Sequence, residues 1–358
     1  MRLAFVVPGG LQRVSGGFIY DRQLIAALRA RGATVDVVPL PWLPFAVALA
    51  SNLVPWSRAL RGYDVVIEDE LCHPAVVGRR RRARAGGAPV VALVHNLACR
   101  QLSTRHRRLR GFIERAYLRG VDGVAAVCAS TLADVEQLAG CVSFGAVAPA
   151  GRDHVAAHDA DAVAARAHER GPLRVLFAGT VTPAKGLHRL VDVLSALVRA
   201  GHDLSVDVAG AVDQAPSYGQ MLRERVAEQR LLDRVRWHGL LHGDALWALY
   251  RRCHVLALPS AREAYPLVAI EALASGLPVL ITDQGGTREL LATGPHALLL
   301  PPDDQAAWTQ ALISFAGDRN ALAAAGQSAL ARFAALGTWA DAADAVLALC
   351  RRLCHPAR

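Results

Sequence analysis

The sequence lacks the features that define several large classes of protein. No stretch offers the eighteen or more uninterrupted apolar residues of a membrane-spanning helix. Its seven cysteines include no Cys-x-x-Cys pair, and no nearby histidine or cysteine completes a metal-ligand set. We therefore expect no transmembrane protein, disulfide scaffold or zinc domain, and we expect reduced, mostly buried thiols in a cytoplasmic protein.

Lysine is almost absent. Of the 40 basic residues, Lys185 is the one lysine and the rest are arginine. A lysine kept in so arginine-rich a chain indicates a site that needs a compact point charge, with chance as the alternative explanation. Two common phosphate-binding motifs, Gly-x-Gly-x-x-Gly and the Walker-type Gly-Lys-[Ser/Thr], are also missing. Their absence argues against a dinucleotide oxidoreductase and a Walker-type nucleotidase.

Positive charge is concentrated in the first third of the chain. Residues 1–120 contain 19 arginines and seven acidic residues, including arginine runs at Arg79–Arg82 and Arg100–Arg110. An uncharged apolar segment between Trp42 and Trp56 lies beside them in the sequence. We expect peripheral contact with an anionic membrane surface, although a buried or dimer-facing loop also explains the apolar segment. No aromatic-plus-basic reading motif is present, so we expect no nucleic acid partner.

Short apolar strands alternate with helical segments through both halves of the chain. This alternation predicts an α/β protein with two doubly wound parallel sheets, whose ligands bind at the carboxyl ends of the strands. The Ala- and His-rich stretch 155–170 has no strand pattern and is interpreted as a linker. We expect Rossmann-like domains over 1–165 and 166–337, facing across a cleft, and a final helix over 338–358 that packs back on the first domain.

The strongest chemical signal is the stretch 259–279. A buried strand leads into a short loop that holds Glu263, and Pro266 then opens a helix that contains Glu271 in an apolar run. The first amides of a helix favour phosphate, and a carboxylate in such a run needs partners, for which a pair of ribose hydroxyls is suited. For either carboxylate alone, a helix cap or an exposed position is the simpler explanation.

Two further loops follow predicted strands. The segment from Gly179 and Thr180 to Lys185 and Gly186 delivers the lone lysine to the start of a helix, an arrangement suited to a pyrophosphate. The loop around Gly285 supplies backbone amides next to another strand end. Each loop alone is a weak signal, because glycine-rich strand-to-helix turns are common.

Taken together, these motifs resemble the retaining GT-B glycosyltransferases of family 4. The family's E-x7-E signature is similar to Glu263 and Glu271, and its glycine and Lys-Gly motif is similar to Gly179, Lys185 and Gly186. Its GG-x-x-E turn resembles Gly285, Gly286 and Glu289. In the N-terminal half, Gly16-Gly17, His95 and the element Pro149-x-Gly151-x-Asp153 also match, so the resemblance runs nearly end to end.

The resemblance implies the site residues. Lys185 would bind the diphosphate of a nucleotide sugar, Glu271 its ribose hydroxyls and Glu263 hydroxyls of the donor sugar. The catalytic residues would be His95, Lys185 and Glu263, with an acceptor-side loop at Gly16 and Gly17. The donor-binding residues would be Gly179, Thr180, Lys185, Glu263, Ala264, Tyr265, Pro266, Leu267 and Glu271. Thr180 stands where the family usually has an arginine, and Ala264 and Pro266 replace glycines.

The implied reaction moves a sugar from a nucleotide-diphosphate sugar to an acceptor hydroxyl with retention of configuration. The acceptor would be a sugar, a lipid or a small molecule, and no metal or other cofactor is implied. Asp159 and Asp161 form a DxD sequence, but it lies in the linker, away from any strand end. The alternatives are a sugar-nucleotide epimerase or phosphorylase of the same fold, and a degenerate nucleotide-binding module.

Overall fold

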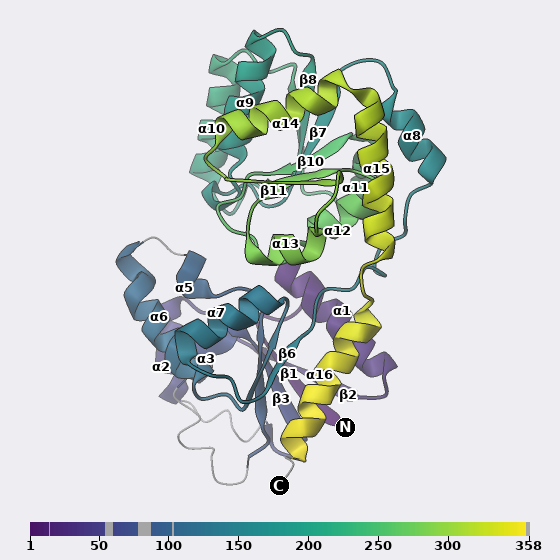
Figure 1. The fold of residues 1–358 in the computed structure, drawn as a ribbon. Helices are drawn as coiled ribbons and strands as arrows, with labels where there is room; N and C mark the ends of the chain where they lie inside the picture. Colours follow the sequence, from purple (N-terminus) through teal and green to yellow (C-terminus); the bar gives the residue numbers. More distant parts are fainter. Residues whose placement is uncertain (14, 54–59, 78–86, 102–103, 356–358) are drawn as a thin grey trace. The chain divides into compact units, whose positions relative to one another are not determined.

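The computed structural model describes residues 1–13, 15–53, 60–77, 87–101 and 104–355. The chain forms two compact units, each built on a six-stranded parallel sheet with helices on both faces (Figure 1). The first unit comprises Met1–His154 and Gly337–Arg358, and the second comprises Val155–Leu336.

The sheet of the first unit has the strand order β2-β1-β3-β4-β5-β6. The order in which successive strands are added to the sheet reverses beside β1, so β1 and β3 flank the point where ligands of such sheets bind. The strands are β1 (Arg2–Pro8), β2 (Thr34–Leu40), β3 (Val65–Asp69), β4 (Val90–Val94), β5 (Gly123–Ala126) and β6 (Gly145–Val147). The helices are α1 (Gly16–Ala30), α2 (Phe45–Ala50), α3 (His73–Val76), α5 (Ala98–Gln101), α6 (Thr104–Leu118), α7 (Ala129–Ala139) and α16 (Trp339–Cys354), with short 3-10 turns η1 (Ser51–Leu53) and η3 (Glu70–Cys72).

Helix α1 begins directly at the glycine pair of the sequence. Its N-cap, Ser15, is extended and makes no side-chain cap, and the helix ends before Gly32, whose φ of +83° suits glycine. One face of the helix buries Leu24 and Leu28 in the unit. The start of the helix at Gly16 puts Gly16 and Gly17 in its first turn.

Helix α16 belongs to the first unit although it closes the chain. A Cβ atom on Gly151 would lie 2.0 Å from the backbone nitrogen of Trp339, so only glycine allows this approach. Asp153 Oδ1 accepts a hydrogen bond from the same nitrogen at 2.7 Å. The Trp339 ring packs edge-on against Tyr20 of α1 at 5.1 Å. The element 149–153 therefore fixes the start of the last helix.

The segment Arg319–Cys354 is long and apolar enough to cross a membrane, with a mean hydropathy of 1.4 in its most apolar window. It consists of two helices, α15 (Arg319–Ala334) and α16, which are separated by a break at 335–338. Half of the window is buried, and Val346 and Cys350 of α16 are fully covered. These helices are core helices of their units.

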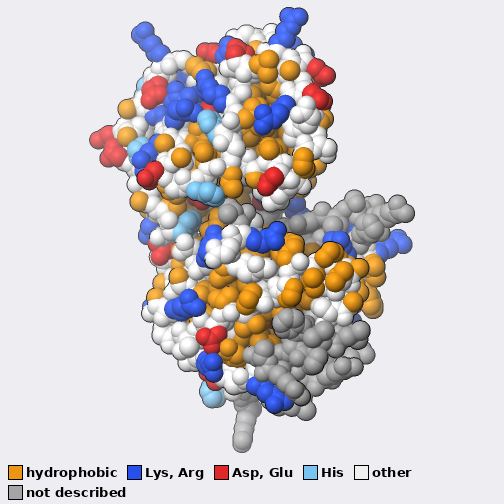
Figure 2. Space-filling view, turned by 180° about the vertical axis from the view of Figure 1, so that it is seen from behind, with side chains coloured by type: hydrophobic (Ala, Val, Ile, Leu, Met, Phe, Trp, Pro, Cys, Tyr) orange, Lys and Arg blue, Asp and Glu red, His pale blue; other side chains and the backbone are white. Residues whose placement is uncertain are grey.

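Hydrophobic side chains also gather on the surface of the first unit. Figure 2 shows such a patch on one face, with arginine side chains near it. Apart from Met1, the large exposed hydrophobic residues in the described part of this unit lie mainly on α2, α6 and the segment before α2: Trp42, Val47, Leu49, Leu71, Leu109 and Phe112. Two parts of the predicted membrane-contact region fall outside the described residues: Trp56 and the arginine run Arg79–Arg82.

The sheet of the second unit has the order β12-β11-β10-β7-β8-β9. This is the dinucleotide-fold order, and its switch point lies between β7 and β10. The strands are β7 (Leu173–Ala178), β8 (Leu204–Ala209), β9 (Val235–Gly239), β10 (Val255–Leu258), β11 (Val279–Thr282) and β12 (Ala297–Leu300). The helices are α8 (Ala160–Ala167), α9 (Leu187–Arg199), α10 (Pro216–Glu228), α11 (Gly243–Arg252), α12 (Leu267–Ala274), α13 (Gly285–Leu291), α14 (Gln305–Gly317) and α15, with a 3-10 turn η4 (Pro183–Lys185).

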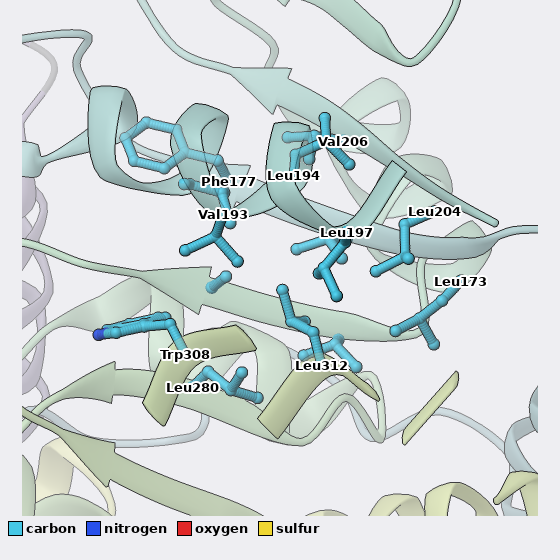
Figure 3. Close-up of a cluster of buried hydrophobic side chains, with 14 of the residues drawn as sticks. Leu173, Phe177, Val193, Leu194, Leu197, Leu204, Val206, Leu280, Trp308 and Leu312 are labelled. Atoms are coloured by element: carbon cyan, nitrogen blue, oxygen red, sulfur yellow. The ribbon is translucent and has the colours of Figure 1, made fainter. Parts of the chain in front are cut away.

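One hydrophobic core supports this second sheet. Leu194 and Leu197 of α9 gather with Trp308 and Leu312 of α14 and with side chains of the strands in this core (Figure 3). The strands contribute alternate apolar residues such as Phe177 and Val206, which are buried almost completely. Because α9, α10 and α14 pack on the strands in this core, the strand ends that carry the loops are held in fixed positions.

The predicted linker is mostly a packed helix. Helix α8 lies against α15, and its Val163 is 1% exposed. Arg166 donates hydrogen bonds from Nη2 to the carbonyl oxygens of Ser275 and Gly276. The division between the units therefore falls after His154, not after residue 165, because α8 buries apolar surface in the second unit. The Ala- and His-rich sequence of residues 155–170 gave no sign of this contact.

Candidate functional site

The loops that follow β7 and β10 meet at the switch point of the second sheet. The first runs from Gly179 to Gly186, and the second carries Glu263. Backbone contacts join them: the N–H of Ala261 donates to the carbonyl of Ala184 at 2.7 Å. Thr282, at the end of β11, donates from Oγ1 to the carbonyl of Ser260 at 2.6 Å. Three neighbouring strand ends are thus held together by direct hydrogen bonds.

Gly186 is required for this junction. It has a φ of +73°, in the left-handed region, and a Cβ atom there would lie 1.9 Å from the carbonyl oxygen of Pro259. No side chain fits, and no flexible neighbour can move aside because the obstacle is backbone. The glycine after the lysine therefore sets how closely the two loops approach.

Lys185 and Glu263 form an ion pair across these loops. Lys185 Nζ lies 2.6 Å from Glu263 Oε1, and Ser260 Oγ donates to the same oxygen at 2.7 Å. Glu263 is 9% exposed and Ser260 is fully buried, whereas the Lys185 side chain keeps 34% of its surface exposed. The ammonium is therefore held in place from behind and remains accessible to a ligand.

The other predicted donor-binding residues lie at the ends of the same strands. Gly179 and Thr180 follow β7, and Gly179 has a φ of +148° with open space at its Cβ position. Ala264 and Tyr265 continue the loop after Glu263. Pro266 is the N-cap of α12, which begins at Leu267 with no side-chain cap and no acidic residue in its first turn. The first amides of this helix are suited to an anion.

Glu271 lies within α12 and is held by a tyrosine. Tyr250 of α11 donates its hydroxyl hydrogen to Glu271 Oε2 at 2.7 Å. Both residues are buried, with Glu271 9% exposed. Burial raises the pKa of the Glu271 carboxyl, and the tyrosine hydrogen bond partly offsets this rise. The predicted need of this carboxylate for a partner is met on one side, and its second oxygen can accept other donors.

The loop after β11 is organised by its own cap. The N-cap Gln284 and Thr287 form a reciprocal capping box at the start of α13, which begins with Gly285 and Gly286. Glu289 lies on the exposed face of this helix. The first turn of α13 is therefore held by side chains, in contrast with the uncapped start of α12.

In the first unit, His95 lies where β4 ends and contacts helix α1. A Cβ atom added to Gly17 would lie 3.6 Å from His95 Cδ2, an ordinary contact, and nothing lies within 4 Å of the Cβ position of Gly16. His95 Nε2 lies 3.1 Å from Asp21 Oδ1 and 3.7 Å from Asp69 Oδ2. The His95 backbone N–H donates to Glu70 Oε2 at 2.9 Å.

The carboxylates at the end of β3, Glu68 to Glu70, are buried, although three consecutive acidic residues are usually exposed. Asp69 is 1% exposed and Glu70 is 6% exposed. Burial and the charge of Asp69 raise the pKa of Asp21 to about 7, and burial is also the main cause that raises the pKa of Glu70 to about 8. Burial opposes the charge of His95, but Glu70, Asp21 and Asp69 outweigh it and raise its pKa well above the usual value.

The residues that could hold a metal ion belong to this cluster. Among the described residues, Asp21, Asp69 and His95 form the one group of three with ligand atoms within 4.8 Å of one another. The DxD sequence has a structural role instead, because Asp159 caps α8 by accepting a hydrogen bond from Ala162 N. Its aspartates lie away from the strand ends, as the sequence indicated.

The structure thus gathers the predicted residues into two clusters, one in each unit. Sequence reasoning missed Asp21, Ser260 and Tyr250. The signal available for Asp21 was a lone carboxylate four residues after Gly17 on an otherwise apolar helix face. Ser260 and Tyr250 are common residue types at unremarkable positions, and only the folded contacts identify them.

Two family models match consecutive parts of the chain. The model for glycosyl transferases group 1 matches residues 161–332, and the model for glycosyltransferase family 4 matches residues 14–154. Together they cover both units, including all the predicted site residues.

Curated relatives align over part of the chain. A D-inositol 3-phosphate glycosyltransferase of Nocardia farcinica is 34% identical over 211 residues, which cover 56% of this chain and 46% of that protein. The lipopolysaccharide core biosynthesis mannosyltransferase LpsB of Rhizobium meliloti is 35% identical over 157 residues, which cover 43% of this chain and 44% of that protein. The chain therefore matches less than half the length of each of these relatives.

Solved structures share the fold along the whole chain. A sucrose-phosphate synthase from Thermosynechococcus elongatus has a TM-score of 0.82 at 22% identity, with 98% of both chains covered. Anabaena HepE in complex with UDP has a TM-score of 0.78 at 17% identity, with 97% of this chain and 99% of that chain covered. Two family models that match both units, and this shared two-sheet architecture, establish that the chain belongs to the GT-B glycosyltransferases of family 4.

Proposed function

We propose that the chain is a glycosyltransferase that moves a sugar from a nucleotide-diphosphate sugar to an acceptor hydroxyl with retention of anomeric configuration. The observation that carries the proposal is the Lys185–Glu263 pair at the β7/β10 switch point. The pair joins Lys185 to the loop that leads to the uncapped start of α12. A diphosphate bound there would be stabilised by the Lys185 ammonium and by the free first amides of the helix. Relatives with glycosyltransferase names, and a similar fold solved with UDP-glucose, support this assignment.

The proposed roles follow from position and charge. Lys185 and the first amides of α12 bind the diphosphate, and Glu271, held by Tyr250, accepts from the ribose hydroxyls. Glu263 then orients the donor sugar by accepting from its hydroxyls. Because Thr180 replaces the usual arginine, Lys185 neutralises a larger share of the negative charge of the diphosphate than in typical relatives.

In this reaction the protein mainly positions the substrates and stabilises the leaving group. As the sugar–phosphate bond breaks, negative charge develops on the diphosphate, and Lys185 with the helix-start amides stabilises it. The leaving diphosphate takes the proton of the acceptor hydroxyl, which attacks from the same face of the sugar. We propose that no metal or other cofactor is needed, since these groups supply the positive charge.

The test is a two-stage measurement. Thermal unfolding with UDP-, GDP- and ADP-sugars first identifies the donor, because a ligand that binds the native state raises the midpoint. Nucleotide diphosphate release is then measured with that donor, with and without sugar, lipid and small-molecule acceptors, in the presence of EDTA. Acceptor-dependent release, with a product anomer like that of the donor by NMR, supports the proposal.

Two other outcomes separate the alternative functions. Release or isomerisation of the nucleotide sugar without any acceptor would indicate an epimerase. Binding without turnover for every donor and acceptor would indicate a degenerate binding module, for which Thr180 is the supporting observation. Release that disappears with EDTA and returns with a divalent cation would contradict the metal-free mechanism.

We further propose a cytoplasmic enzyme that contacts an anionic membrane surface through α6. Arg107, Arg108 and Arg115 are exposed on this helix, and Leu109 and Phe112 are 62% and 71% exposed on it. Arg110 lies over the ring of Phe45 on α2 at 4.6 Å, so the two helices form one basic and apolar surface. Exposed hydrophobic side chains among arginines are typical of helices that lie at a lipid interface.

A further inference from the structure

The cluster around His95 contains more negative charge than one imidazole can balance. Asp21 from α1, Asp69 from the end of β3 and Glu70 from η3 all face the same histidine. Asp21 is fully buried, and its Oδ2 atom has no hydrogen-bond donor among the residues that the structure describes. Three ionised carboxylates at buried positions would repel one another strongly, because little solvent screens their charges. The cluster must therefore retain protons.

The hydrogen bond between His95 Nε2 and Asp21 Oδ1, at 3.1 Å, puts one of these protons between the histidine and a carboxyl group. The raised pKa values of about 7 for Asp21 and about 8 for Glu70 have burial as their first cause. Two further titratable groups lie near Glu70: His73, whose Nδ1 lies 2.7 Å from the Glu70 carbonyl oxygen, and the buried thiol of Cys72, whose pKa is raised by burial and by the nearby carboxylates. Tyr20 adds an aromatic edge 4.8 Å from the His95 ring and no charge.

The two nitrogens of His95 have different surroundings. Nε2 is directed at Asp21 and Asp69, and Gly17 packs near the same edge of the ring. None of the described residues hydrogen-bonds Nδ1, and the His95 side chain keeps 15% of its surface exposed. When Nε2–H donates to Asp21, Nδ1 is the ring nitrogen that remains to hydrogen-bond a ligand.

We propose that Asp21, supported by Asp69, is a positioning residue that keeps His95 an imidazolium with Nε2–H directed at Asp21, so that Nδ1–H is the donor presented to the substrate. A charged donor of this kind binds an oxygen, either a sugar hydroxyl or an anionic oxygen, more strongly than a neutral imidazole does. It selects substrates that carry an acceptor oxygen at that point. This inference rests on the proposed transferase function for its kinetic consequence, but not for the state of the ring.

The first test observes the ring directly in the free full-length protein. Nitrogen-15 NMR of the histidine-labelled chain, with His95 assigned from a His95→Gln variant, follows its titration. We expect both ring nitrogens to be protonated at pH 7.5. In Asp21→Asn, which keeps the side-chain shape, the pH midpoint of His95 should fall by at least about one pH unit. Asp36→Asn, which removes an exposed partner of Arg2 in the same unit, should leave it unchanged.

The second test measures transfer with the donor found by the thermal screen. Asp21→Asn should lower kcat by about tenfold or more, with less than about a threefold change in the KM for the donor, and should move the alkaline limb of the pH profile downward. Asp69→Asn is the second variant and should act in the same direction. UDP binding to the second unit should be unchanged in both.

The outcomes separate this inference from the proposed function. A neutral His95 at pH 7.5, or equal midpoints in wild type and Asp21→Asn, would overturn it. So would Zn²⁺ or Mn²⁺ that moves the His95 resonances in wild type but not in Asp21→Asn, because the cluster would then hold a metal ion in place of protons. If wild type transfers no sugar, the proposed function fails while the NMR titration still decides the state of His95.

Discussion

Two glutamates eight residues apart have different physical environments in the second unit. Glu263 lies at the switch point and contacts the ammonium of Lys185, whereas Glu271 is held by the hydroxyl of Tyr250 and contacts no described cation. A diphosphate must share or displace Glu263 to reach Lys185. A ribose, by contrast, adds donors to Glu271 without breaking an ion pair.

This difference predicts opposite effects of two conservative changes on binding of the bare nucleotide. Glu271→Gln should weaken UDP binding by about tenfold, because one charge-assisted hydrogen bond is lost. Glu263→Gln should bind UDP as tightly as wild type or more tightly, because Lys185 loses its competing partner. Titration calorimetry measures both, with the exposed Glu228→Gln as a control. The reverse order of affinities would contradict the assigned roles.

Single residues were predictable from sequence where a motif fixed both their type and spacing. Lys185, Glu263 and Glu271 belonged to such motifs, and the structure brings the first two into direct contact. Tyr250 was not predictable and Asp21 gave only a weak signal, because each acts through a neighbour that is distant in the chain. The burial of Glu68–Glu70 was not predictable, because consecutive acidic residues are usually exposed and no local pattern indicated the contact with His95.

At the scale of elements, α6 combines basic and apolar exposure on one helix. The exposed Leu109 and Phe112 would insert shallowly among lipid chains, while the arginines contact headgroups. Each arginine near an anionic surface contributes about 1 kcal/mol, so three of them and two apolar anchors give measurable but reversible binding.

We therefore expect the protein to sediment with vesicles that contain an anionic phospholipid and not with neutral vesicles. The double change Leu109→Ser and Phe112→Ser should reduce the bound fraction several-fold at constant salt. A control change, Leu232→Ser, removes an exposed leucine of the second unit and should have no effect. Equal binding to neutral and anionic vesicles, or an unaffected double variant, would contradict this role of α6.

Helices and strands were predictable from sequence when their own residues showed a clear apolar pattern or a capping signal. The strands of the second sheet were predictable from the alternation of strands and helices, because each is a short buried apolar run between breakers. Helix α8 was interpreted as linker and α15 was not predicted, because both are rich in alanine and have a weak apolar stripe. Their stability comes from packing on one another, which no local pattern contains.

At the scale of the whole molecule, the two units divide the chemistry. The second unit holds the groups suited to a diphosphate and a nucleoside, and the first holds the His95 cluster and the glycine pair of α1. The alternation of strands and helices predicted two sheets, and the expected return of the last helix to the first unit is made through contacts of Trp339 with Gly151 and Asp153. The family resemblance, not the pattern, supplied the reaction.

The most direct test of the central claim is nucleotide diphosphate release by Lys185→Ala, measured with the donor and acceptor that wild type uses. We expect release to fall by at least about a hundredfold, because the charge that stabilises the leaving group is lost. The thermal midpoint without ligand should stay close to that of the control Arg199→Ala, an exposed cation of the same unit. Release at the wild-type rate by a folded Lys185→Ala protein would contradict the account.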